Sequence, residues 1–355
     1  VSALIDGIVM GTLGAPFRIV WAVGNERAVA RCPVNFASID PPAGAKNPIC
    51  VGAIYSNNDT MTSFSSWGPT DDGRIKPDLC APGGQSNADG GVTSADVGGG
   101  YTALQGTSMA SPAVTGICAL LLQDLRARFP QYAHTDPPNA LLKALLVHTA
   151  ADLGHAGPDY QFGYGAARAA AAVVFLRTSP FLEDAVADRA VRTYAIDIPQ
   201  GLSELKATLV WDDIPSTLNV VPALINDLDL VAVSPSGVAH HPWTLDPARP
   251  GDGAVRTTPD HTNNVEQIQV AAPEPGAWTL RVTGYNAPEG QQTFVLATTP
   301  GIQASPSTGA IAFTAVEYPC SGTAEIIVVD SDLNADPAQV EFASARVYSD
   351  SDPAG

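Results

Sequence analysis

Apolar and polar positions follow two different patterns along the chain, and the first pattern covers residues 1–177. Residues 17–25 and 49–56 are short, nearly continuous apolar runs, which are typical of strands buried on both faces of a parallel sheet. Strands that alternate with helices indicate an α/β fold with a doubly wound parallel sheet. Apolar side chains recur at helical spacing in four segments, which we expect to be helices: residues 1–11, 107–129, 138–151 and 165–177.

After about residue 178 the pattern changes to short runs rich in β-forming residues. Gly, Pro and Asn separate these runs, as is typical of an antiparallel sandwich or jelly roll. We therefore expect a jelly-roll β-barrel domain over residues 178–300. Residues 301–355 are β-rich as well, but hold too few strands for a complete sandwich, so we expect a truncated third domain. The predicted strands of the second region are residues 204–213, 227–237, 266–276, 277–286 and 292–300.

The charge of the chain argues against two classes of partner. The 355 residues include 18 Lys and Arg against 36 Asp and Glu, which gives a net charge of −18. A surface of that sign repels phosphate backbones and anionic membranes, so we expect no nucleic-acid or membrane partner. No uninterrupted apolar run reaches the length of about 18 residues that a membrane span requires. The sequence starts inside a predicted helix without a signal peptide, so we expect a truncated start.

The cysteines do not form a recognisable framework. Five cysteines are an odd and sparse set: Cys32, Cys50, Cys80, Cys118 and Cys320. Cys32 and Cys50 could pair across a loop in an exported protein, whereas Cys118 lies in an apolar helix and is expected to be a small core residue. None has a CxxC or Cys/His spacing, so we expect no cysteine-based zinc site.

The segment GTSMASP at residues 106–112 is the strongest candidate for chemistry. Ser108 is predicted to lie in the first turn of a long helix, with Thr107 as its N-cap and Gly106 allowing a sharp turn. The field of the helix N-terminus favours negative charge near the hydroxyl, and the N–H of Ser108 points towards an oxyanion formed there. A serine at a helix start is usually only a cap, but this heptapeptide is far more specific.

This heptapeptide resembles the nucleophile motif of the subtilisin-like serine proteases, the subtilases. Three further regions are similar to that family in order and spacing: VWAVGNE (20–26), FSSWGP followed by KPDLCAPG (64–83), and FGYGAARAA (162–170). The resemblance covers residues 1–177 and implies the C-terminal part of a subtilase catalytic domain. It also implies a secreted serine endopeptidase that acts on protein or peptide substrates and needs no cofactor for its chemistry.

The resemblance assigns roles to individual residues. Ser108 would attack the peptide carbonyl, and the side-chain amide of Asn25 would stabilise the oxyanion together with the N–H of Ser108. A Gly-Asn pair is also a common turn, but the downstream serine favours the functional interpretation. The residues expected to bind substrate are Trp21, Ala22, Val23, Gly24, Gly106 and Thr107.

The chain departs from the family in the rest of its catalytic triad. The family's Asp motif and its HGTHVAG-like His motif normally lie upstream of the asparagine, and neither is present. We expect His148 to be structural and His240 and His241 to be surface residues. The chain alone should therefore be close to inactive, and its partner is expected to be the missing N-terminal portion of the same polypeptide. All six histidines follow the nucleophile: His134, His148, His155, His240, His241 and His261.

Residues 180–300 resemble the β-barrel that follows the catalytic domain in the alkaline, oxidatively stable subtilases. The similar segments include LINDLDLVAVSPSG (224–237) and GAWTLRVTGYNAP (276–288). Oxygen ligands for a structural calcium are expected from Asp227, Asp229, Asn263 and Glu266, although turn and cross-strand hydrogen bonds would also explain these residues.

A second calcium candidate is DSDLNADPAQVE at residues 330–341. It matches an EF-hand template at four positions, but Ala335 replaces the required glycine and Pro337 disturbs the loop. We favour a polar β-turn over an inter-domain calcium loop.

Two other functions stay open. One is a non-catalytic binding or structural module built on a protease-like scaffold. The intact GTSMASP segment and Asn25 favour the enzyme, because a decayed site would usually lose its nucleophile. The other is a different serine hydrolase such as an esterase, which would need a GxSxG elbow, whereas Ser108 lies in G-T-S-M-A.

Overall fold

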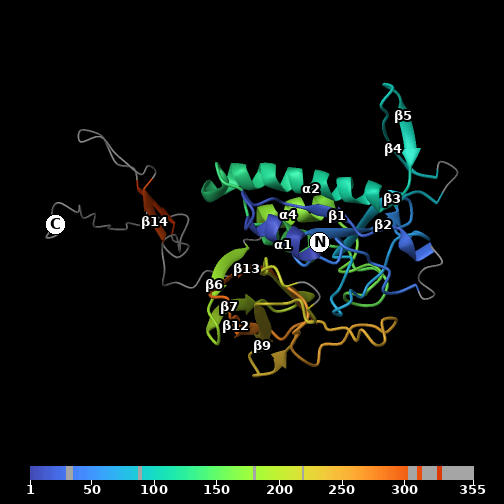
Figure 1. The fold of residues 1–355 in the computed structure, drawn as a ribbon. Helices are drawn as coiled ribbons and strands as arrows, with labels where there is room; N and C mark the ends of the chain where they lie inside the picture. Colours follow the sequence, from blue (N-terminus) through green and yellow to red (C-terminus); the bar gives the residue numbers. More distant parts are fainter. Residues whose placement is uncertain are drawn as a thin grey trace, which may run out of the picture. The chain divides into compact units, whose positions relative to one another are not determined.

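The computed structural model describes residues 1–28, 35–86, 90–178, 181–217 and 220–302, together with two short strands near the C-terminus. The chain divides into two compact units, Val1–Ile302 and Gln303–Gly355. In the second unit, strands β14 (Ala310–Phe313) and β15 (Ile326–Val329) pair antiparallel (Figure 1). The calcium candidate at residues 330–341 lies outside the described residues.

Four α-helices form where the apolar spacing predicts them, within a few residues at each end. They are α1 (Ser2–Met10), α2 (Thr107–Arg128), α3 (Asn139–His148) and α4 (Ala169–Thr178), with short 3-10 helices at Glu26–Ala28 and Pro130–Tyr132. The predicted N-cap of α2 is wrong by one position. Gly106 is the N-cap and Thr107 is the first helical residue, because the Thr107 hydroxyl bonds to another loop and not to its own helix.

A three-stranded parallel sheet lies under α2, in agreement with the predicted α/β class. Its order is β1 (Val20–Ala22), β2 (Ile49–Tyr55) and β3 (Leu79–Gly84), and all pairs are parallel. Figure 1 shows α2 running across this sheet, and the helix packs against all three strands. Its Val114, Leu121 and Leu125 are fully buried, so one stripe of α2 covers the sheet as an apolar strand surface requires.

A hairpin that the sequence patterns did not predict stands directly before α2. Its strands are β4 (Val92–Ala95) and β5 (Tyr101–Leu104), paired antiparallel. Figure 1 shows the hairpin extending away from the body of this unit, and Val97 at its turn is completely exposed. None of its strand residues is buried, so it lacks the apolar alternation that marks a core strand.

Two four-stranded antiparallel sheets form the second half of unit 1. Their orders are β10-β9-β12-β7 and β11-β8-β13-β6. Trp278 and Leu230 from one sheet and Leu209 from the other meet in a shared apolar core. The antiparallel sheets are as predicted, whereas the jelly-roll connection stays a prediction. The strands are β6 (Leu182–Val186), β7 (Val191–Ile198), β8 (Glu204–Val210), β9 (Asp227–Val233), β10 (Ala239–His240), β11 (Val265–Ala271), β12 (Gly276–Asn286) and β13 (Gln292–Thr299).

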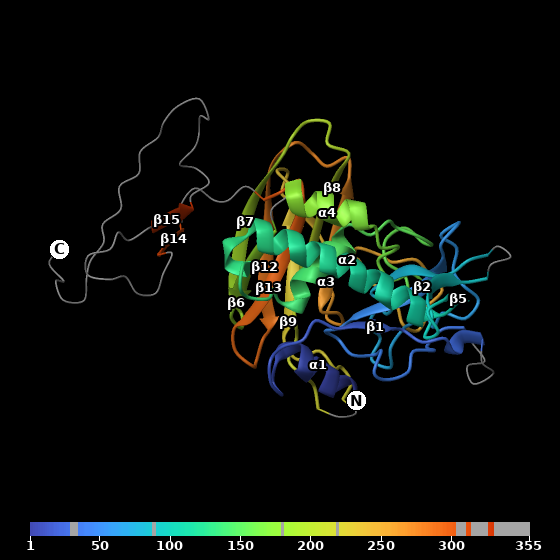
Figure 2. The same cartoon turned by 90° about the horizontal axis from the view of Figure 1, so that it is seen from above.

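Helix α3 joins the two halves of unit 1 into one core. All ten of its residues are buried, and it packs against α4 and against strands β8 and β13 (Figure 2). Leu141 and Leu145 share an apolar cluster with Val210 and Val295 of the antiparallel sheet. The change of sequence pattern near residue 178 therefore marks a change from helices and parallel strands to antiparallel strands inside one compact unit.

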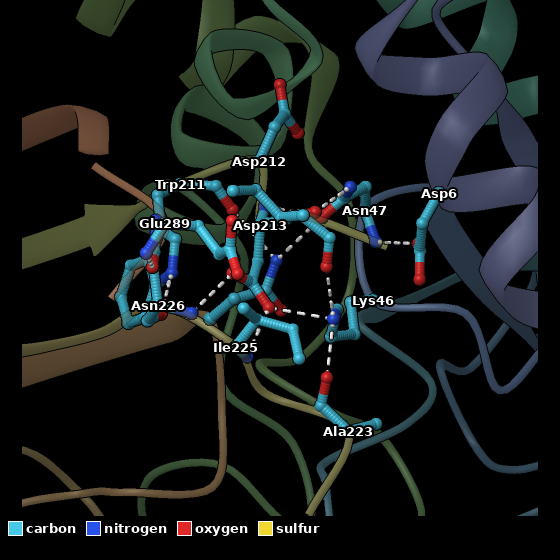
Figure 3. A network of polar contacts seen from close by, with 12 residues as sticks. Asp6, Lys46, Asn47, Trp211, Asp212, Asp213, Ala223, Ile225, Asn226 and Glu289 are labelled. Atoms are coloured by element: carbon cyan, nitrogen blue, oxygen red, sulfur yellow. Dashed lines mark hydrogen bonds and ion pairs between the residues drawn. The ribbon is translucent and has the colours of Figure 1, made fainter. Parts of the chain in front are cut away.

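A buried polar network also connects the two halves (Figure 3). Lys46 Nζ lies 2.7 Å from Asp213 Oδ2, and the two side chains are 1% and 0% exposed. Asn47 donates to the carbonyl of Asp213 at 2.7 Å and accepts from its N–H at 2.8 Å. The N–H of Asn47 donates in turn to Asp6 at 2.8 Å, so the network runs from α1 to the loop after β8.

The described cysteines are buried free thiols. Cys118 lies in the core of α2 as expected, and Cys80 is fully buried in β3. The Cys50 thiol donates to the carbonyl of Ala43 at 3.1 Å, so no disulfide forms there. Cys32, its expected partner, lies outside the described residues.

Helix α2 meets the length and composition of a membrane span, with a mean hydropathy of 1.2 over an 18-residue window. Only 28% of that window is buried. The helix nevertheless packs its apolar stripe on the sheet, as a core helix does. Its other face is exposed and consists largely of small and apolar residues, including Ala113, Gly116, Ala119 and Leu120.

Candidate active site

The structure places Asn25 beside the start of α2. The side-chain oxygen Oδ1 of Asn25 accepts hydrogen bonds from the N–H of Thr107 at 2.9 Å and from its hydroxyl at 3.1 Å. The same hydroxyl oxygen accepts the N–H of Gly24 at 3.3 Å. Thr107 thus clamps the loop after β1 onto the first turn of the helix.

This bonding orients the Asn25 amide. Because Oδ1 faces Thr107, Nδ2 is directed away from it, and no acceptor is bonded to Nδ2 in the part of the chain that the structure describes. A side chain on Gly106 would lie 3.6 Å from Nδ2 of Asn25 and 3.7 Å from the N of Ser108. Gly106 also has φ +150°, which favours glycine. Glycine therefore keeps open the space that both donors border.

Ser108 is exposed as the second residue of α2, and Asn25 is exposed across from it. The first N–H groups of a helix have no acceptor within the helix, so the N–H of Ser108 is available to an oxygen placed above Gly106. The helix dipole adds a partial positive charge at the same point. The arrangement can stabilise a negatively charged oxygen next to the serine hydroxyl.

Ser66 holds the loop between β1 and the first 3-10 helix, and we did not predict this role. Its hydroxyl accepts the N–H of Glu26 at 3.0 Å, and its N–H donates to the carbonyl of Gly24 at 2.9 Å. A side chain on Gly24, where φ is +114°, would lie 3.0 Å from the Ser66 hydroxyl. The signal in the sequence was the segment FSSWGP, which contains this serine.

The remaining residues of the predicted substrate site differ in exposure. Trp21 and Ala22 are half-buried in β1, and Val23 is buried. Gly106 and Thr107 are buried as well. Val23 and Thr107 thus offer almost no surface to a substrate, and the substrate roles of all six predicted residues, Gly24 included, stay predictions.

No histidine bonds to Ser108 among the described residues. His148 is buried, with Nδ1 2.9 Å from the Thr208 hydroxyl and Nε2 2.8 Å from that of Thr299. Burial lowers the pKa of His148 to about 3, so it is neutral and structural as predicted. His240 is half-buried against Trp278, at 5.0 Å between ring centroids, and is less exposed than expected.

A second group of titratable residues lies in the antiparallel sheets. Ligand atoms of Asp227, Asp229 and His261 all lie within 4.8 Å of one another. Asn263 is hydrogen-bonded to other groups: its Oδ1 accepts the N–H of Ile75 at 2.8 Å, and its Nδ2 donates to Asp260 at 2.8 Å. His261 thus takes the place that we had expected Asn263 to fill.

Burial dominates the electrostatics of this group. Burial raises the pKa of Asp227 to about 7, with His261 opposing the shift and Asp229 adding to it. Burial also raises the pKa of Asp229. The fully buried Glu266 has a pKa well above its usual range, first through burial and then through the negative charges of neighbouring aspartates.

Comparison with known proteins adds the family. Residues 1–165 match the model of the subtilase family, Peptidase S8. Serine protease AprX of Bacillus subtilis is 42% identical over 100 residues, which cover 24% of this chain and 23% of that protein. A serine protease/ABC transporter B family protein of Dictyostelium discoideum, tagB, is 27% identical over 314 residues, covering 68% of this chain and 16% of that protein.

Among solved structures, the CspB protease of Clostridium perfringens is 30% identical with a TM-score of 0.36, covering 42% of this chain and 31% of that one. The chain spans less than a quarter of the length of the two curated relatives named above. The stretch that matches the family model includes both Asn25 and Ser108. From this match and the identity to AprX, residues 1–165 are a segment of the subtilase family.

Proposed function

We propose that this chain supplies the nucleophile and the oxyanion-binding groups of a secreted serine endopeptidase that cleaves peptide bonds in proteins. One observation carries the proposal: a Cβ on Gly106 would lie 3.6 Å from Nδ2 of Asn25 and 3.7 Å from the N of Ser108, while Oδ1 of Asn25, at 3.8 Å, already accepts the N–H of Thr107. Membership of the subtilase family supports it, as does the name of the relative AprX, a serine protease.

The chemistry follows from these positions. The Ser108 hydroxyl attacks the substrate carbonyl, and the negative charge that develops on the carbonyl oxygen is held by Asn25 and by the N–H of Ser108. One such donor lowers the barrier by about 2.7–4 kcal/mol, a magnitude measured in a subtilisin. The donors are fixed before reaction by the Thr107 clamp, so they need little reorganisation.

The serine also needs a base to accept its proton. We propose that the His and the Asp that orients it come from the N-terminal portion of the same polypeptide, and that this chain alone is nearly inactive. Two surfaces support an additional segment. Strand β1 is an edge of its parallel sheet, where unpaired backbone groups can bond to another strand. Next to it, the outer face of α2 leaves Leu120 51% exposed.

The proposal extends to partners and location. Protein or peptide chains are the proposed substrates, and the net charge of −18 disfavours nucleic acids and anionic membranes. The proposed location is extracellular.

A fluorophosphonate probe tests the assignment on the longest gene product that contains this chain. We expect labelling that Ser108→Ala abolishes and that Ser111→Ala, one turn further along α2, leaves unchanged. The 355-residue chain by itself should label at background level. Labelling that survives Ser108→Ala would refute the nucleophile.

The non-catalytic module remains a second candidate, favoured by the absence of a histidine at Ser108 among the described residues. It predicts that the longest gene product stays unlabelled although circular dichroism shows it folded. Genetic sequence upstream of Val1 that encodes Asp and His motifs would argue against this candidate.

A further inference from the structure

Three side chains, two from strand β9 and one from the loop before β11, converge at one end of β9. Asp227 and Asp229 are two residues apart on β9, so both side chains point to the same face of the strand. His261 comes from the loop before β11, and its Nδ1 lies 2.9 Å from Asp227 Oδ2 and 3.4 Å from Asp229 Oδ1. These separations resemble those of neighbouring ligands around one metal ion with bonds of about 2.0–2.2 Å.

A fourth side chain shows that the group is not satisfied by its own contacts. Glu266 is fully buried, and its Oε2 accepts the N–H of Leu230, the residue after Asp229, at 2.6 Å. Its Oε1 has no hydrogen-bond partner among the described residues. Its bond to the residue after Asp229 places this carboxyl beside β9, where the negative charges of Asp260, Asp229 and Asp227 act on it. An unpartnered buried oxygen is costly unless a cation or a proton compensates it.

Three more buried polar atoms of this region make no hydrogen bond among the described residues, although Asp229 Oδ1 has His261 Nδ1 at 3.4 Å. They are Oδ1 of Asp227, Oδ1 of Asp229 and Nδ1 of His241. His241 is close enough to Asp229 to act on its charge. The carboxylate oxygens of this region thus have too few hydrogen donors among the described residues to satisfy them.

We propose that Asp227, Asp229 and His261 bind one divalent transition-metal ion, Zn²⁺ in the first instance, with Glu266 and His241 facing the same site. An imidazole nitrogen among the ligands favours Zn²⁺ over Ca²⁺, because Ca²⁺ takes oxygen ligands almost exclusively. The structure thus changes the cation expected from the sequence, since the amide oxygen of Asn263 is replaced by a nitrogen ligand. This proposal is independent of the proposed protease activity.

The imidazole is held in the orientation that the site requires. The rings of His261 and Tyr285 stack at 4.0 Å between centroids with an interplanar angle of 21°. Tyr285 lies at an irregularity of the pairing between β12 and β9, where the register shifts between Gly284 and Asn286. Such bulges redirect a side chain, and here the tyrosine ring supports the face of the histidine.

A metal at this site would stabilise the contact between the two halves of unit 1. His261 lies between Asp260, which accepts the N–H groups of Thr262 and Asn263, and Asn263, whose Oδ1 binds the N–H of Ile75. Fixing His261 on β9 therefore also fixes the loop that reaches Ile75.

The test uses the full 355-residue chain stripped with a chelator, and measures Zn²⁺ binding by isothermal titration calorimetry and thermal shift. We expect one ion per chain, and a rise in Tm of about 5 °C at a concentration 100 times Kd. His261→Ala and the isosteric Asp229→Asn should each weaken binding by more than about 10-fold. His134→Ala, at an exposed histidine, and Asp252→Asn, at an exposed carboxylate, are the matched controls.

Cobalt adds a readout that does not depend on stability. Co²⁺ bound at this site should give visible absorption bands that disappear in His261→Ala, while circular dichroism shows that the variant is folded. No binding at one equivalent, or binding unchanged in both site variants, would overturn the proposal and leave His261 as a polar partner of the two aspartates. Binding of Ca²⁺ in preference to Zn²⁺ would refute the transition-metal assignment.

Discussion

Replacing Lys46 by methionine tests whether the buried network of Figure 3 holds the two halves of unit 1 together. Methionine keeps most of the side-chain volume but removes the ammonium group. Asp213 would then be a fully buried carboxylate without its cation, and the carbonyl oxygens of Ile214 and Ala223 would lose their donor. Breaking a buried ion pair in this way costs about 3–5 kcal/mol.

The structure points to the lower half of that range. Asp213 keeps two other donors, the N–H groups of Ile225 at 2.9 Å and Asn226 at 2.8 Å, which still stabilise its charge. We therefore expect a loss of about 3 kcal/mol and a fall in Tm of roughly 6 °C. Such a loss is a large share of the ~5–15 kcal/mol by which a typical folded protein is stable.

Urea unfolding followed by tryptophan fluorescence measures the loss. Trp211 is fully buried and donates its indole N–H to the carbonyl of Asn226 at 2.8 Å, next to the network. A double-mutant cycle with Asp213→Asn should give a coupling above about 1 kcal/mol. Arg126→Met, in a pair where both side chains are about half exposed, is the control and should cost less than about 1 kcal/mol. A Lys46→Met loss no larger than that of the control would refute the reasoning.

Three further predictions concern the site and the core. In the complete enzyme, Asn25→Ala should lower kcat about 100- to 1000-fold with KM little changed, which is the effect known for such a donor in a subtilisin. The rate of peptide hydrolysis measures this loss, and an unchanged kcat would contradict the prediction. Gly106→Ala forces a side chain onto a backbone with φ +150°. It should lower the free energy of unfolding in urea by about 1–3 kcal/mol and reduce fluorophosphonate labelling. Normal labelling would exclude the space above Gly106 as the oxyanion site. The pKa of His148 falls from 6.5 to about 3 on folding. Between these two pH values, therefore, His148 is protonated in the unfolded chain and neutral in the folded one. Stability should then drop by about 2.3 kcal/mol from pH 6.5 to pH 4.5 relative to His148→Gln, and parallel pH profiles of the two proteins would contradict this.

The elements that the sequence predicted well are those whose side chains follow one burial pattern. Strand β2 is a continuous apolar run and is buried over nearly its whole length, and α3 is largely apolar and buried on all sides, including its Lys143. Strands β6 and β7 were missed because their buried positions are few and irregular. Their pairing depends on partners far along the chain, which local patterns do not contain.

The active-site residues could be named from the sequence, but their arrangement could not. The motif around Ser108 is local, and so is the Gly-Asn pair that ends with Asn25. The contact between them spans 82 residues and passes through Thr107, whose hydroxyl we assigned to a helix cap. In the acidic cluster, the two aspartates share a strand and were predicted together, whereas His261 reaches them only through the folding of its loop.

The complete burial of α3 has a consequence for engineering and for evolution. Helix α3 packs on one side against the N-terminal half of unit 1 and on the other against strands β8 and β13. It would lose half of its cover if those strands were removed. Cutting the gene near residue 178 would expose leucine side chains such as Leu141 and Leu145 and favour aggregation. Transferring strands β6 to β13 to another protease would likewise require transferring α3 with them.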